Sequence, residues 1–213
     1  SVDTTRIPDL DSLLTAMAEG DDDYRYSVAW IDPQAKGRHL GRSVLGRGEH
    51  ASLDQLGPRQ AIEPLAYGAR QLVSMPPLVP PMGVINHATV AAFNEVWYRK
   101  APRRRVGELQ SIATFFHPLD MVGSWNRVYG TKGMLQYQVV VPFGAEEAMR
   151  TVIERFAASG TASFLAVLKR FGPGSLAPLS FPAPGWTLTL DVPAGTGGLG
   201  NLLHGLDRLV LDA

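Results

Sequence analysis

The stretch MLQYQVVVPFGAEEAMRTVIERFAASG, residues 134–160, decides the fold because the spacing of its apolar residues changes partway along. Residues 134–141 alternate between two faces, which predicts a half-buried strand. Residues 146–158 place apolar side chains at helical spacing instead, which predicts an amphipathic helix. Its inward side chains are Met149, Val152, Ile153 and Phe156. A strand followed at once by such a helix indicates a helix that packs on its own sheet.

The rest of the second half continues in the same manner. Residues 162–171 and 186–192 predict two strands, and residues 199–211 predict a helix with a leucine-rich stripe. The order strand, helix, strand, strand, helix is that of the ferredoxin-like βαββαβ unit without its final strand. We expect that strand beyond Ala213, and because the chain also opens on Ser1, we expect a piece of a longer protein, truncated at its C-terminus.

The first half predicts fewer elements. Apolar residues from Leu10 to Met17 recur at helical spacing, residues 24–30 alternate as an aromatic-rich strand, and residues 41–46 suggest a weaker strand. Four prolines in residues 75–83 predict a loop. Asn86 is a candidate cap for a helix that ends before Pro102. Its expected inward residues are Val90, Phe93 and Trp97. These elements predict an α+β fold with a largely antiparallel sheet and flanking helices.

Composition limits the function classes. The chain of 213 residues is 45% hydrophobic, enough for one large domain or two small ones. Twenty basic and twenty acidic residues balance, so no overall field favours nucleic acid. The absence of cysteine excludes disulfides and thiolate metal sites, and the five scattered histidines form no i, i+4 pair, so we expect no metal. No apolar run of membrane-spanning length and no signal peptide is seen, which predicts a cytoplasmic or peripheral membrane location.

Two glutamines give the strand at residues 134–141 an unusual face. Alternation places Gln136 and Gln138 on one side of the strand, with Leu135 and Tyr137 on the other. Each amide offers two donors and an acceptor, which suits sugar hydroxyls or the polar edge of a flavin. A simple solvated sheet face is the alternative interpretation.

Lys169 is the second unusual residue, because alternation puts it beside Val167 and Phe171 on its strand. Burial lowers the pKa of a lysine ammonium, whereas an anionic ligand or a carboxylate holds it charged, which favours a substrate phosphate or hydroxyl as its partner. A lysine that reaches water from a strand end is the alternative. Thr187 and Thr189 share the polar side of the last strand with Asp191. They become candidates for a site if they face the same cavity as the two glutamines and Lys169.

Three further patterns have structural interpretations. His117 and Asp120 have no third partner in view, so a role in a turn is expected. The glycine pattern at residues 195–200 matches G-x-G-x-x-G, but the strand before it alternates, so a turn into the last helix is expected. The basic residues between 99 and 105 read as a solvated loop that could also meet anionic lipid headgroups, and they are a weak signal for nucleic acid.

Several short motifs in combination resemble one enzyme family. They are HPLD, WNRxYG, LQYQ, FGP, PLSFPxPGW and LDRLVL, and the similarity is dense over residues 107–191. The chain resembles the substrate-binding part of FAD-linked sugar oxidases of the decaprenylphosphoryl-β-D-ribose oxidase type, within the vanillyl-alcohol-oxidase-like flavoproteins. The resemblance implies that residues 1–213 are a substrate-binding domain, with an FAD-binding domain before it and a further flavin-side lysine after it.

Position by position, the resemblance implies a pocket near the flavin and the sugar. Gln136 and Gln138 would contact both cofactor and substrate, and no catalytic base is assigned. The other implied pocket and entrance residues are Lys169, Phe171, Trp30, Phe116, Leu119, Trp125, Arg127, Thr187 and Thr189. The family has asparagine and cysteine where this chain has Thr187 and Thr189, and an aromatic hydroxyl where it has Phe116. These departures leave open a related sugar as substrate.

The resemblance implies oxidation of a sugar hydroxyl with FAD, in arabinan precursor synthesis for cell walls, with polyprenyl-phosphoryl ribose as substrate and a short-chain reductase as partner. An aldonolactone or alditol oxidase of the same superfamily is one alternative. A ferredoxin-like binding module without catalytic activity is another. The isolated chain is expected to be inactive and colourless.

Overall fold

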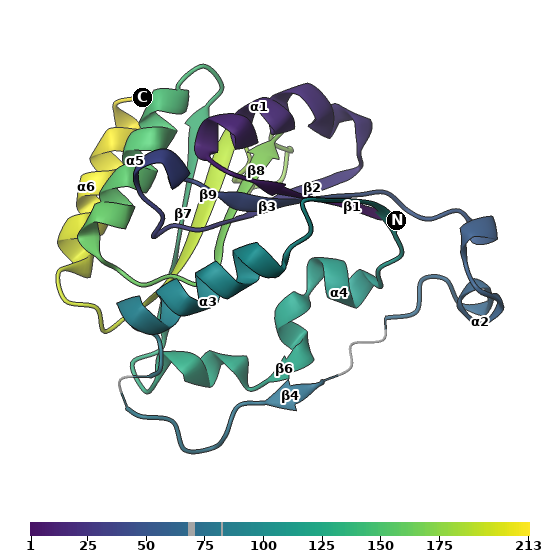
Figure 1. The fold of residues 1–213 in the computed structure, drawn as a ribbon. Coiled ribbons are helices and arrows are strands. Elements are labelled where there is room, and N and C mark those ends of the chain that lie inside the picture. Colours follow the sequence, from purple (N-terminus) through teal and green to yellow (C-terminus); the bar gives the residue numbers. More distant parts are fainter. Residues whose placement is uncertain (68–70, 82) are drawn as a thin grey trace.

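The computed structural model describes residues 1–67, 71–81 and 83–213. A seven-stranded sheet with the order β5-β1-β3-β2-β8-β9-β7 organises the chain, and every neighbouring pair is antiparallel (Figure 1). Its strands are β1 (Val2–Ile7), β2 (Tyr26–Ile31), β3 (Ser43–Gly48), β5 (Arg104–Glu108), β7 (Met134–Pro142), β8 (Ala166–Phe171) and β9 (Gly185–Pro193). A short parallel pair joins β4 (Val73–Ser74) to β6 (Val122–Gly123).

The helices lie on both sides of this sheet. They are α1 (Leu10–Gly20), α2 (Pro58–Ile62), α3 (His87–Lys100), α4 (Ile112–Phe116), α5 (Glu146–Ser159) and α6 (Leu199–Leu211). In Figure 1, α1 lies on one side of the sheet and α3 and α4 lie on the other. The α+β class with a mostly antiparallel sheet is therefore confirmed.

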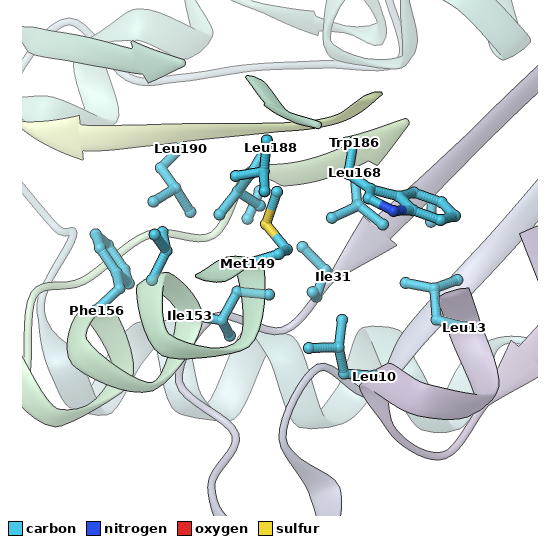
Figure 2. Close-up of a cluster of buried hydrophobic side chains, with 14 of the residues drawn as sticks. Leu10, Leu13, Ile31, Met149, Ile153, Phe156, Leu168, Trp186, Leu188 and Leu190 are labelled. Carbon is cyan, nitrogen blue, oxygen red and sulfur yellow. The ribbon is translucent and has the colours of Figure 1, made fainter. Parts of the chain in front are cut away.

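The hydrophobic core lies between the sheet and helices α1, α5 and α6. Strand residues with side chains on this side, such as Ile31, Leu168 and Leu188, are buried against Leu10 of α1 and Met149 of α5 (Figure 2). Burying a leucine or isoleucine side chain contributes about 1.5–3 kcal/mol each. We call this side of the sheet the core face. The opposite side, which carries Gln136, Gln138, Lys169, Thr187 and Thr189, is called the polar face.

The second half has the expected ferredoxin-like arrangement. Strand β9 lies between β7 and β8 and is antiparallel to both, as the split βαββαβ order requires. The predicted inward residues of α5 are all buried, and α6 has the predicted bounds. The strand expected from residue 162 begins four residues later, at Ala166.

Two predictions for the first half were wrong. Phe93 and Trp97 of α3 are 42% and 43% exposed instead of buried. The reason is that polar contacts attach this helix to the sheet: Asn94 donates to Asp32 at 2.7 Å, and the guanidinium of Arg42 bridges Asp32 and Glu95. The basic run between residues 99 and 105 is also more regular than a loop, since it ends α3 and begins the edge strand β5.

Strand β1 was not predicted, because VDTTRI is too polar to stand out. The proline-rich segment forms no helix or strand over residues 75–81 and 83, while residue 82 lies outside the described residues. In the part of the chain that the structure describes, no helix is long and apolar enough to cross a membrane.

Candidate functional site

The polar face brings the predicted site residues of four strands together. Cross-strand pairing aligns Trp30 with Val167, Val167 with Thr189, and Thr189 with Gln138. These residues form one row across β2, β8, β9 and β7. In the next row Lys169 pairs with Thr187. From the sequence, the threonines are candidates for the site if they face the same cavity as the glutamines and Lys169. The structure places the threonines on the same face of the sheet as these residues.

Each glutamine donates to a neighbour on β9. Nε2 of Gln136 lies 2.8 Å from the Asp191 carboxylate, and Nε2 of Gln138 lies 3.0 Å from Oγ1 of Thr187. Both glutamines are exposed. An ionised carboxylate can only accept, so Asp191 directs the amide oxygen of Gln136 away from itself. A threonine hydroxyl can accept or donate, so the Gln138 amide can present either its oxygen or its nitrogen to a ligand.

Asp191 is the most buried acid of this face, with 1% of its surface exposed. Burial raises the pKa of its carboxyl, and the hydrogen bond from Gln136 partly opposes that rise. Tyr129 lies nearby and is also buried; burial, and secondarily the charge of Asp191, raise the pKa of its phenol. The phenol oxygen has no hydrogen-bond partner among the described residues. At this end of the face, burial therefore disfavours the negatively charged forms of both the Asp191 carboxyl and the Tyr129 phenol.

Lys169 lies at the other end of the face and is exposed. Among the described residues it forms no ion pair, whereas the adjacent Arg170 pairs with Asp22 at 3.1 Å. Its exposure favours the interpretation of a strand lysine that reaches water. The same exposure leaves the ammonium available to an anionic ligand.

Lys169 borders a cavity of about 650 Å³ together with Phe171 and Phe116. The cavity lies beside the part of β2 and β8 that forms no register pairs, since these strands pair only at Ala29 with Leu168 and at Trp30 with Val167. Volumes of about 300–1,000 Å³ are typical of small-molecule sites. Of the residues implied by the family, the structure thus places Lys169, Phe171 and Phe116 around one cavity.

Trp30 lies on the polar face but has a structural hydrogen bond. Its indole Nε1 donates to the carbonyl of Phe164 at 3.0 Å, and Phe164 packs edge-to-face on Phe93 of α3. Trp30 therefore connects the row of polar residues to the helix that covers the far end of the face. Its ring edge is held in place before any ligand binds.

The remaining implied residues lie away from Lys169, in the segment that follows α4. Trp125 borders a separate cavity of about 380 Å³ and packs edge-to-face on Tyr129. Arg127 donates to the carbonyl of Met75 at 3.4 Å, and Leu119 lies in the 3-10 turn Pro118–Met121. The structure does not bring these three residues into the cavity of Lys169. Trp125 contacts Tyr129, and Tyr129 in turn lies near Asp191 of the polar face.

Two of the three patterns given structural interpretations, the His117–Asp120 pair and the glycine-rich residues, lie in turns. Asp120 accepts from the hydroxyl of Tyr67 at 2.9 Å, and His117 packs edge-to-face on the Tyr67 ring. The glycine-rich residues 195–198 form a turn, and Gly198 precedes α6 with a positive φ. Within residues 1–67, 71–81 and 83–213, no group of three or more His, Asp or Glu side chains could hold a metal ion.

Sequence reasoning missed several residues that the structure places at the site. Tyr26 and Phe115 line the cavity of Lys169, and Tyr129 lies near Asp191. Alternation along β2 could have placed Tyr26 on the face of Trp30. No sequence signal indicates that Tyr129, which precedes Asp191 by 62 positions along the chain, approaches that carboxylate.

The sequence of the chain is similar to those of known proteins. No protein-family model matches the chain. The chain is 44% identical over 204 residues to the decaprenylphosphoryl-β-D-ribose oxidase of Mycolicibacterium smegmatis, an alignment that covers 95% of this chain and 44% of that protein. It is 36% identical over 219 residues to an uncharacterized protein in the mprA 5′ region of Streptomyces coelicolor, covering 99% of this chain and 58% of that protein.

The chain therefore spans about half the length of the curated relatives it matches. The resemblance to the decaprenylphosphoryl-β-D-ribose oxidase family holds over almost the whole chain. The first of these relatives is named as an oxidase.

Proposed function

We propose that this chain is the substrate-binding part of an FAD-dependent oxidoreductase that oxidises a hydroxyl group of a sugar. The substrate we favour is polyprenyl-phosphoryl ribose, oxidised to its 2-keto form as a step toward arabinan precursors. The observation that supports this most is the shared face of Lys169, Gln138 and Gln136, in a chain that is 44% identical to an oxidase of that lipid-linked sugar.

The residues of the polar face fit a flavin ring and a sugar better than a whole dinucleotide. Gln136 and Gln138 present exposed amide groups, which can pair with the N–H and C=O groups along the polar edge of a flavin. The turn at residues 195–198 follows a strand of alternating polarity, unlike a dinucleotide-binding strand. We therefore propose that another part of the natural protein binds most of the FAD, and that this chain covers the reactive ring.

When bound, the flavin would supply a hydride acceptor for the carbinol carbon of the sugar. This chain would bind and orient the sugar. Gln136, fixed by Asp191, offers an acceptor to a ligand hydroxyl or N–H, and Gln138 can adapt to either polarity. The ammonium of Lys169 would attract the phosphate.

Thr187 and Thr189 stand where the family resemblance implies asparagine and cysteine. This difference favours an alternative substrate for the same class of flavin-dependent oxidase. Thr187 already accepts from Gln138, and an asparagine at that position would offer an amide nitrogen that threonine lacks. A soluble aldonolactone or alditol is therefore the second candidate substrate. A short-chain reductase that takes the keto product, and peripheral association with a membrane, remain proposals that follow from the lipid-linked substrate.

The test uses the whole natural protein that contains this sequence. Its visible flavin spectrum is recorded without oxygen, before and after the addition of polyprenyl-phosphoryl ribose. Bleaching of the flavin is expected, and a Lys169→Met variant is expected to need at least about tenfold more substrate for half-maximal bleaching. Bleaching by a soluble lactone or alditol alone would select the second candidate. A protein without flavin would contradict the proposal and favour a binding module.

A further inference from the structure

A second cavity adjoins the cavity of Lys169 and has a different chemical character. It encloses about 820 Å³ between α4 and the segment of residues 51–66. Its apolar wall is formed by Leu53, Leu56, Leu65, Leu109, Ile112 and Phe115. Leu53 and Leu65 are 63% and 69% exposed, so their side chains are not covered by this chain. Exposed apolar side chains that gather around one hollow indicate an apolar occupant.

The two cavities meet at three aromatic residues. Tyr26, Phe115 and Phe116 line both of them, and the ring of Phe116 lies 4.9 Å from those of Tyr26 and Phe115. Phe116 is 43% exposed. A ligand can therefore pass from one cavity to the other along the exposed side of this aromatic cluster.

Glycines of β3 make room for that cluster. A Cβ atom at Gly48 would lie 3.2 Å from the Phe115 ring, so a larger residue there would push against Phe115. The strand positions that face α4 thus have no side chains to fill the space between helix and sheet. The passage runs over backbone and aromatic rings, and its one polar group among these rings is the hydroxyl of Tyr26, 3.2 Å from Nε2 of His50.

The two ends of this groove differ in the chemical group of a ligand that they favour. At one end Lys169 has no ion pair among the described residues, while the nearby Arg25 and Arg170 are paired with Glu49 and Asp22. At the other end the wall of the cavity is mostly apolar, although Arg59 also lines it and forms no ion pair among the described residues. A ligand that satisfies both ends has an anionic group next to a flexible apolar chain.

We propose that the leucine-lined cavity holds the first isoprene units of the lipid chain of the substrate, while Lys169 binds its phosphate. This inference rests on the proposed function and extends it, because it states how a lipid-linked sugar is distinguished from a soluble one. A soluble lactone or alditol would leave the second cavity without an occupant. The cavity volume accommodates a few isoprene units, and the rest of the chain extends beyond the exposed leucines.

The binding test uses this full chain with three probes: farnesyl phosphate, farnesol and inorganic phosphate, followed by backbone amide shifts in NMR spectra. Each buried methylene strengthens binding by about fourfold, so farnesyl phosphate should bind at least about tenfold more tightly than phosphate. It should shift amides near both Lys169 and Leu65. Equal affinities for farnesyl phosphate and phosphate would overturn the inference.

Matched variants separate the two ends of the groove. Leu53→Ser with Leu65→Ser should weaken farnesyl phosphate about tenfold and leave phosphate unchanged, since both side chains are exposed and the fold does not depend on them. Lys169→Met should weaken both phosphorylated probes. The control is Leu176→Ser, which alters an exposed leucine outside both cavities. An unchanged farnesyl phosphate affinity in the double variant, or a change in oligomeric state instead, would overturn the inference.

A comparison of substrates separates this inference from the proposed function. The whole natural protein is given farnesylphosphoryl ribose or methylphosphoryl ribose, and the rate of flavin bleaching is measured. We expect kcat/KM to be at least about tenfold higher for the farnesyl compound, and the double leucine variant to remove most of that difference. Equal rates with both compounds would overturn the lipid-chain site and keep the function. Bleaching by neither compound would overturn both.

Discussion

The two faces of the sheet differ in what covers them. On the core face, Leu188 of β9 packs under α1, α5 and α6 with 1% of its surface exposed. On the polar face the next residue, Thr189, lies in a row with Gln138 and Trp30. The core face is completed by this chain's own helices. The polar face carries exposed amides and an ammonium without an ion pair among the described residues.

This difference separates stability from function within a single strand. Side chains that alternate along β9 serve the fold on one side and the site on the other. A substitution on the core face should therefore change the free energy of unfolding. A substitution on the polar face should change ligand binding with little effect on unfolding.

The largest expected effect is on the core face. Leu188→Ala should lower the free energy of unfolding by about 3 kcal/mol, because it removes buried methyl groups and leaves a cavity. Its partner variant Thr189→Ala should cost less than about 1 kcal/mol. Urea denaturation of both variants provides the comparison, and equal losses would contradict the distinction between the faces.

The attachment of α3 should show the next largest effect. Arg42→Met leaves the buried carboxylate of Asp32 without its cation, and we expect a loss of about 2 kcal/mol, because Arg42 is partly exposed to solvent. Arg104→Met, on the exposed edge strand β5, is the control and should cost less than about 0.5 kcal/mol. Thermal unfolding of both variants measures the difference. A stable Arg42 variant would mean that apolar contacts hold α3, as they hold α5.

Substitution of Asp191 should have a smaller effect on the free energy of unfolding, and this effect should depend on pH. Its folded pKa is raised above the unfolded value, so the stability it contributes is present at low pH and is lost as the pH rises through the folded pKa. Asp191→Asn keeps an acceptor for Gln136 and removes the buried charge. We expect no gain in stability near pH 3 and a gain of about 1 kcal/mol at neutral pH.

The matched control for Asp191 is Glu154→Gln, which changes an exposed acid on α5. Urea denaturation across this pH range should show no comparable trend for the control. A gain for Asp191→Asn that is independent of pH would argue against a desolvated carboxylate on the polar face.

Lys169→Met should have the smallest effect on folding, less than about 0.5 kcal/mol, because the side chain is exposed and without an ion pair among the described residues. Binding of inorganic phosphate to this chain should nevertheless weaken. NMR titration with phosphate checks this, with Lys100→Met on α3 as the control. A marked loss of stability would mean that Lys169 serves the fold.

Alternation and helical spacing predicted the second half of the fold, because each strand there has one clearly apolar face. Those rules also placed Gln136 and Gln138 on one side of their strand and Lys169 beside Val167 and Phe171 on another strand. That all three lie on the face opposite the core follows only from the pairing of the strands. Strand β1 could not be predicted, because its residues are polar and its pairing partners on β3 lie 36 to 46 positions away, from Ile7 with Ser43 to Val2 with Gly48. The cavity beside Lys169 lies between segments far apart in the sequence, such as β2 and β8, and local patterns do not encode how such segments pair.

The most direct test of the central claim compares flavin bleaching in the whole natural protein with polyprenyl-phosphoryl ribose. Oxygen is excluded, and the wild type is compared with Lys169→Met and with the control Lys100→Met. If the polar face binds the substrate, the wild type and the control should bleach at similar rates, and Lys169→Met should be slower by at least about tenfold at low substrate concentration. Equal rates in all three proteins would contradict the assignment of this face to the substrate.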